Sequence, residues 1–329
     1  METTELLKKI KTIPINTGIL ADELLAGNFS SVFKGQGVEF DELRHYQPGD
    51  DIRSIDWNAC ARFGKPFIKL YREERDMTIL IVMDTSASMH RDSGTFRPET
   101  ASEKRLSPYE QGVLAAALIA FSAEKKSQRV GALLFDSGIH RVFLPRKGRH
   151  HLMALTGSLI QNQKYVQRKN PVSHNETKGT GSNIAGALSG AERLLKRRSL
   201  VVLVSDFLSV NWETQLAALC RKHNVLALRV SDPADVQLPE RGLAVMEDPE
   251  TGLKITAPAF RSFREAWKEW HVQRAEIWAA ACRRAAAAHL ELPVTIDAAS
   301  ALYRFFSTAS ADSFLRKGIR SRPFYSGDF

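Results

Sequence analysis

Short apolar runs alternate with amphipathic segments along the middle and later parts of the chain. The runs at residues 78–83 and 200–205 are continuous and apolar, which is typical of strands covered on both faces. Apolar positions at helical spacing predict helices over residues 109–125, 183–196 and 212–223. The alternation predicts an α/β fold: an open, mostly parallel sheet with helices on both faces.

Further elements continue this pattern on both sides of the second buried strand. Apolar residues 129–135 and 139–144 flank the turn Asp136-Ser137-Gly138, which favours a hairpin. The remaining predictions are a helix at 151–160, a strand at 225–230, a small hairpin formed by 243–246 and 253–256, a long helix at 260–288, a strand at 292–296 and a helix at 299–315. The sheet is therefore expected to continue past the small hairpin, which reads as an insertion.

The part of the chain before residue 76 has a different character. A helical pattern covers residues 6–25, and glycines and prolines interrupt short alternating pieces over 35–67, which predicts irregular β structure before a strand at 67–72. The expected organisation is an N-terminal helical segment (1–27), a small β-rich subdomain (28–75), an α/β domain (76–316) with a hairpin insertion near 241–258, and a basic tail (317–329).

Composition narrows the class of protein. The chain has 329 residues, a formal net charge of +9 and a hydrophobic share of 43%, enough for a sizeable core. Its three separated cysteines indicate a reducing compartment, and no run reaches the length of a membrane helix. The N-terminus lacks an apolar signal core, so a cytoplasmic protein is expected rather than a secreted, collagenous or membrane-spanning one.

Candidate chemistry begins where the first buried strand ends. The sequence Asp84-Thr85-Ser86-Ala87-Ser88 places one carboxylate and two hydroxyls at alternating positions. The carboxyl ends of parallel strands are where ligands bind in open α/β sheets. Hard cations such as Mg²⁺ prefer oxygen ligands, so Asp84, Ser86 and Ser88 are candidate metal ligands.

Two further segments could reach the same place. The second buried strand is followed by Asp206, which meets Asp84 if the two strands are neighbours. A polar loop entering a helix offers a hydroxyl from Ser182 or from Thr180, and Ser182 equally suits the N-cap of that helix.

These motifs resemble a known family. Asp84 to Ser88 after TILIVM, Gly-Ser-Asn-Ile-Ala-Gly-Ala-Leu from Gly181, and Val-Ser-Asp ending at Asp206 are similar to a von Willebrand factor A-type domain with its metal-ion-dependent adhesion site. The resemblance implies a Rossmann-like sheet and a site for Mg²⁺, Mn²⁺ or Ca²⁺. The implied ligands are Asp84, Ser86, Ser88, Ser182 and Asp206, with Thr180 as the alternate to Ser182.

The segment before that domain resembles a second known block. Gly-x-Gly-x-Glu-Phe from Gly35, Leu-Arg-x-Tyr from Leu43 and Pro-Gly-Asp-Asp-x-Arg-x-Ile-Asp-Trp from Pro48 are similar to the bacterial domain of unknown function 58 family. That family joins the block to a von Willebrand A-like domain. Its members are commonly encoded beside a MoxR-type AAA+ ATPase, which implies a shared chaperone-like role in protein maturation or assembly.

Within the block, basic and acidic residues alternate around aromatic ones. A partly buried ion-pair network that fixes the subdomain is the favoured interpretation. The alternative is a partner-docking surface. Its candidate residues are Arg44, Tyr46, Arg53 and Trp57.

Together these features favour a non-enzymatic interaction module whose bound Mg²⁺ accepts an acidic residue of a partner. The polar stretch 161–181 is expected to be a loop that gates the site. One alternative is a Mg²⁺-dependent phosphatase or nuclease using Asp84 and Asp206. The phosphatase motif D-x-D requires a second acid two residues after the first, and Ser86 occupies that position here, which argues against this alternative. Another is nucleic-acid binding by a basic surface, which is not expected because the basic residues are dispersed. Peripheral association with membrane-anchored partners is open, and the sequence does not give the oligomeric state.

Overall fold

The chain is described by a computed structural model. It covers residues 39–47, 50, 55–72, 77–91, 106–169, 181–239, 242–258 and 260–307. These residues belong to two compact units, one within Phe33–Met77 and one that runs from Thr78 onward. The predicted helix at 6–25, Thr180, Arg53 and the tail at 317–329 lie outside the described residues.

The smaller unit pairs two antiparallel strands and adds one short helix. Strand β1 (Glu39–His45) pairs with β2 (Phe67–Arg72), which confirms the predicted strand at 67–72. Residues 57–63, expected to be irregular β structure, instead form helix α3 (Trp57–Phe63). The Asp56 carboxylate accepts two backbone N–H groups at its start, and Gly64 ends it in the left-handed region at φ 66°.

The larger unit is built on one six-stranded sheet. Its strands are β3 (Thr78–Asp84), β4 (Arg129–Phe135), β5 (Ile139–Arg146), β6 (Leu200–Ser205), β7 (Asn224–Ser231) and β10 (Ala288–Pro293). They lie in the order β10-β7-β6-β3-β4-β5, and all pairs are parallel except β4 with β5. Counted along the chain, this is the doubly wound order 3-2-1-4-5-6, which confirms the expected open sheet. The winding reverses between β3 and β6.

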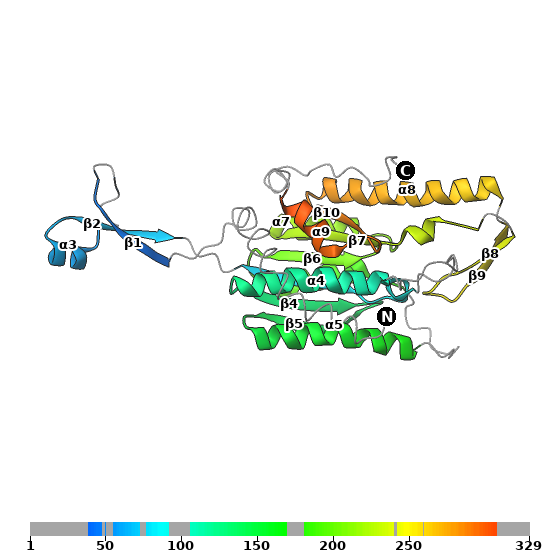
Figure 1. The fold of residues 1–329 in the computed structure, drawn as a ribbon, viewed down its shortest axis with the longest axis horizontal. Helices are drawn as coiled ribbons and strands as arrows, with labels where there is room; N and C mark the ends of the chain where they lie inside the picture. Colours follow the sequence, from blue (N-terminus) through cyan, green and yellow to red (C-terminus); the bar gives the residue numbers. More distant parts are fainter. Residues whose placement is uncertain are drawn as a thin grey trace. The chain divides into compact units, whose positions relative to one another are not determined.

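Helices cover both faces of this sheet. Helix α4 (Pro108–Lys125) contacts four strands and is flanked by α5 (Arg149–Lys169) and α9 (Ala298–Ser307). The opposite face is covered by α6 (Ile184–Leu194), α7 (Glu213–Lys222) and α8 (Arg261–Arg284), which pack on the alternate strand residues in one apolar cluster. Figure 1 shows α4 and α5 running alongside the strands.

Three short elements complete the unit. Two 3-10 turns, η2 (Ala87–His90) and η3 (Pro233–Val236), follow strands β3 and β7. Strands β8 (Leu243–Glu247) and β9 (Lys254–Pro258) form a separate antiparallel hairpin, as the sequence predicts. No helix in the described part of the chain is both long enough and apolar enough to cross a membrane.

Helix α4 approaches the sheet closely at Gly112. Ser107 and Glu110 form a reciprocal capping box at its start, which fixes where the helix begins. A Cβ atom at Gly112 would lie 2.8 Å from Val204 Cγ1 and 3.0 Å from Met83 Cε. Val204 and Met83 belong to the ends of β6 and β3, so this glycine lets the helix support both strand ends.

We expect Gly112→Val to destabilise the protein by about 1–3 kcal/mol, because the added methyl groups overpack a buried contact. The matched control is Gly157→Ala in α5, where an added Cβ would meet nothing within 4 Å. That change should leave stability unchanged or raise it by up to about 1 kcal/mol. Urea unfolding monitored by circular dichroism distinguishes them, and equal midpoints would contradict the proposed close approach.

Two predicted boundaries are wrong. The long helix expected over 260–288 ends at Arg284, and the following strand is Ala288–Pro293 rather than 292–296. The end of the helix could not be recognised because no glycine marks it. Instead Ala286 adopts the left-handed conformation at φ 56°, and the Ala287 N–H donates to the Cys282 carbonyl. The stretch 161–181 is also not all loop, since α5 continues through Lys169.

Strand β5 forms one edge of the sheet. It pairs antiparallel with β4, with two register shifts. Its side chains Ile139, Val142 and Leu144 are exposed. A Cβ atom on Gly131 of β4 would lie 2.9 Å from the backbone nitrogen of Pro145, so the two strands approach closely there.

Candidate metal centre

The ends of β3 and β6 meet at the reversal point of the sheet. These strands are paired in parallel, with Met83 opposite Val204. Asp84 ends β3, Ser205 ends β6 and Asp206 follows directly. The expectation that these two strands are neighbours is therefore confirmed, and the two aspartates stand at one edge of the sheet.

Asp84 is the centre of a hydrogen-bond network. Its Oδ2 accepts from Ser182 Oγ at 2.7 Å and from Ser205 Oγ at 2.6 Å. Its Oδ1 accepts from the Ser86 backbone N–H at 3.0 Å. The carboxylate is completely buried. Its donors, Ser86, Ser182 and Ser205, come from three separate segments and together fix its position.

The other predicted hydroxyls lie in the same place. Ser86 Oγ and Ser88 Oγ are 3.1 Å apart, and both side chains are buried. Thr85, between Asp84 and Ser86, turns away and donates to the Phe135 carbonyl at 2.8 Å. Alternation along the turn therefore gathers Ser86 and Ser88 on the side of Asp84.

Ser182 is predicted either as a metal ligand or as the N-cap of the following helix, and its position decides between these two roles. Asn183, not Ser182, caps α6, with Asn183 Oδ1 accepting the Gly186 N–H at 2.8 Å. Ser182 is thereby free of the capping role and donates to Asp84. The alternate residue, Thr180, lies outside the described residues.

Asp206 is buried, with 3% of its surface exposed, and only half of its carboxylate is satisfied. Oδ1 accepts the Leu208 N–H at 3.1 Å, whereas Oδ2 has no hydrogen-bond partner among the residues that the structure describes. Arg274 is close enough to interact with Asp206 electrostatically, but its guanidinium donates to the carbonyls of Phe207 and Leu208. A buried, unpartnered carboxylate oxygen is costly unless a cation or donor completes it.

The burial of Asp84 and the nearby Asp206 change the protonation of Asp84. Burial, and then the nearby Asp206 carboxylate, raise the pKa of Asp84 from its usual 3.8 to about 7, although hydrogen bonds from Ser205, Ser182 and Ser86 oppose the shift. Ionising Asp84 in this buried place is therefore unfavourable unless a positive charge compensates.

The residues present fit a hard divalent cation. Two carboxylates and several hydroxyls converge, and oxygen is the ligand atom that Mg²⁺ and Ca²⁺ prefer. Within the described ranges, no three His, Cys, Asp or Glu side chains form a metal-binding group by themselves. Of the predicted ligands, only Asp84 and Asp206 carry charge. A metal ion here would therefore also depend on the serine hydroxyls.

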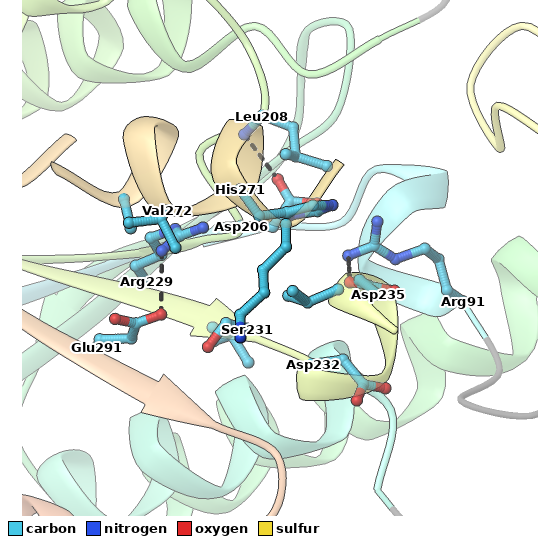
Figure 2. A pocket seen from close by; sticks show the side chains of 14 residues that line it. Arg91, Asp206, Leu208, Arg229, Ser231, Asp232, Asp235, His271, Val272 and Glu291 are labelled. Carbon is cyan, nitrogen blue, oxygen red and sulfur yellow. Dashed lines mark hydrogen bonds and ion pairs between the residues drawn. The ribbon is translucent and has the colours of Figure 1, made fainter. Parts of the chain in front are cut away.

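A charged pocket adjoins Asp206 (Figure 2). Two ion pairs line it, Arg91 with Asp235 at 2.8 Å and Arg229 with Glu291 at 3.0 Å. Burial lowers the pKa of His271, on the same wall, to about 4, so this imidazole is neutral at physiological pH. Two of its basic side chains, Arg91 and Arg229, are thus paired with acids, and Lys268 lies on the same wall.

Sequence reasoning missed two residues of this centre. Ser205 marked the strand end but was not assigned a role, although its hydroxyl makes the shorter of the two bonds to Asp84 Oδ2. Glu250, in the turn of the β8–β9 hairpin, accepts the Ser88 backbone N–H at 2.9 Å across 162 residues of sequence. No local pattern could have indicated that contact.

The docking residues predicted in the smaller unit have mixed surroundings. Arg44 pairs with Asp50 at 2.8 Å, as the network interpretation expects, and Tyr46 is half-buried. Trp57 is 70% exposed at the start of α3, which leaves it accessible as an anchor. Arg53 lies outside the described residues.

Solved structures with a similar outline are distant. BatB from Bacteroides thetaiotaomicron is 13% identical with a TM-score of 0.38, and the match covers 70% of this chain and 97% of that one. A von Willebrand factor type A protein from Catenulispora acidiphila is 13% identical with a TM-score of 0.32, covering 61% of this chain and 43% of its own.

Sequence relatives are closer. Proteins of Mycobacterium bovis and Mycobacterium tuberculosis, both described as uncharacterized, are 32% identical over 254 residues, or 77% of this chain and 74% of theirs. The family model named "Protein of unknown function DUF58" matches residues 42–276, which include most of the signature block, from Leu43 onward, and most of the sheet. The chain therefore belongs to the DUF58 family.

Proposed function

We propose that this chain is a non-enzymatic protein-interaction module that binds an acidic residue of a partner through a divalent cation. The cation would be held at the edge where β3 and β6 meet. Its ligands would be Asp84, Ser86, Ser88, Ser182 and Asp206, directly or through water.

One observation carries the proposal: the buried, unpartnered Oδ2 of Asp206 beside the buried Asp84. Purely structural aspartates at strand ends are satisfied by backbone N–H groups or by basic side chains. Within the described residues, Asp206 keeps a carboxylate oxygen without a hydrogen-bond partner beside a second buried carboxyl group, and a divalent cation would compensate both.

The chemistry of the site favours binding over turnover. When bound, Mg²⁺, Mn²⁺ or Ca²⁺ offers a coordination position that a partner's carboxylate can fill. Ser86, Ser88 and Ser182 are neutral, so they position oxygen atoms without cancelling the charge that attracts the partner. The second acid of a D-x-D phosphatase is replaced by Ser86, which already hydrogen-bonds Ser88.

The partner follows from family resemblance. The resemblance implies that members of this family are commonly encoded beside a MoxR-type AAA+ ATPase. That ATPase, or a protein client that it helps to mature, is therefore the proposed partner. The proposed setting is the bacterial cytoplasm. The exposed Trp57 would be a second, metal-independent contact.

The proposal is tested by pull-down of the MoxR-type ATPase from the same genome by the immobilised chain. We expect recovery in Mg²⁺, and loss of at least about tenfold with a chelator or with Asp84→Ala. Glu265→Ala is the control, because Glu265 is an exposed acid paired with Arg261 on its own helix. Equal recovery in all lanes would refute metal-dependent binding. Mg²⁺-dependent hydrolysis by the wild type that is lost in Asp84→Ala would support the enzyme alternative instead.

A further inference from the structure

The β8–β9 hairpin carries a carboxylate into the candidate metal centre. Glu250 lies in the hairpin turn, and its Oε1 accepts the Ser88 backbone N–H at 2.9 Å. The Ser88 hydroxyl hydrogen-bonds the same carboxylate. Ser88 Oγ in turn lies 3.1 Å from Ser86 Oγ, so Glu250 is continuous with the network around Asp84.

The turn that presents Glu250 is internally braced. Asp248 Oδ1 accepts the Glu250 N–H at 3.0 Å, and Asp248 Oδ2 accepts the Thr251 hydroxyl at 2.6 Å. Gly252, at φ 71°, donates its N–H to the Asp248 carbonyl at 2.7 Å. The tip is therefore preorganised, and Glu250 reaches the centre from a defined position rather than from a free loop.

The surroundings of Glu250 are unfavourable for an anion. Burial, with the carboxylates of Asp206 and Asp248, raises the pKa of Glu250, and the hydrogen bonds from Ser88 only partly oppose this. Glu250 is close enough to Asp206 for their charges to interact, and among the described residues Asp206 Oδ2 is buried without a hydrogen-bond partner. A bound cation would turn this repulsion into attraction.

Resting on the proposed function, we propose that Glu250 is an internal ligand: its carboxylate fills the cation position that a partner's acidic residue would otherwise take. The hairpin then acts as a competitor built into the chain. A partner engages the centre only when its own carboxylate displaces Glu250, and this raises the affinity that a partner needs.

The test uses Mn²⁺ as the probe, with binding and bound-water content read from water-proton relaxation. Wild type should bind Mn²⁺, and Asp84→Asn should lose that binding. Glu250→Ala should bind Mn²⁺ about tenfold more weakly and relax water faster, because one more water occupies the freed position. Acetate, as a model of the partner's carboxylate, should reverse the faster relaxation in Glu250→Ala and change wild type little.

The matched control is Glu265→Ala, which removes one exposed negative charge and should behave as wild type. Glu250→Gln keeps the size and the acceptor for Ser88, and it should resemble Glu250→Ala in its response to acetate. If wild type and both Glu250 variants bind Mn²⁺ with equal affinity, relaxation and acetate response, the internal ligand is refuted while the metal site stands. If wild type binds no Mn²⁺, both proposals fail.

Discussion

When both proteins are free of divalent cations at about pH 8, Asp84→Asn should unfold at a higher temperature than the wild type. The pKa of Asp84 is raised to about 7 in the folded protein from a usual value of 3.8, because of burial and then of Asp206. Ionising this group therefore opposes folding, and the amide removes that penalty. We expect a gain of about 1–3 kcal/mol, or roughly 3–10 °C.

The sign of the pH dependence follows from the raised pKa. Below the unfolded value both states are protonated and Asp84 contributes no penalty; the penalty grows as pH rises toward about 7 and is complete above it. The advantage of Asp84→Asn should accordingly shrink at about pH 5.

Magnesium should reverse the ranking of the two proteins. Wild type gains stability in proportion to the logarithm of the cation concentration over its Kd, about 2.7 kcal/mol at a hundredfold excess. Asp84→Asn should gain nothing. Differential scanning calorimetry with chelator and with Mg²⁺ measures both effects, and identical melting of the two proteins in chelator would contradict the charged, buried pair.

Replacing Arg229 should produce the largest loss of stability. Arg229 on β7 lies directly opposite Glu291 on β10, and the two side chains pair at 3.0 Å with about a tenth of each exposed. The guanidinium also lies 5.9 Å from the centre of the Trp278 ring. Arg229→Met leaves Glu291 without its cation, which should cost about 3–5 kcal/mol in urea unfolding.

A double variant separates the pair from its surroundings. Arg229→Met with Glu291→Leu removes both charges and keeps apolar volume, so it should recover most of the loss. If the double variant is as unstable as Arg229→Met alone, the loss comes from packing against Trp278 and not from an unpaired carboxylate.

The sheet could be predicted because its strands are apolar on both faces. Burial of β3 and β6 by helices on each side leaves a continuous hydrophobic run, and the run ends where the polar site begins. Asp84 and Asp206 could therefore be assigned to one edge before any coordinates, since parallel strands present their carboxyl ends together.

The missed features depend on long-range contacts or on weak local signals. Helix α3 is short and follows its capping residue Asp56 within a mixed polar segment, so its helical periodicity could not be recognised. The ion pair of Arg229 could not be predicted, because its partner, Glu291, is 62 residues away in the sequence. The hairpin of Glu250 was predictable from its turn, whereas the place that its tip reaches is decided by tertiary packing alone.

The edge strand β5 limits how copies of this protein can associate. Pro145 cannot donate a backbone hydrogen bond, and the same strand carries two exposed arginines, Arg141 and Arg146. Register shifts against β4 further disturb the straight ladder that sheet extension requires. Despite three exposed aliphatic side chains, this border is built to resist fibre-like stacking of one molecule on the next.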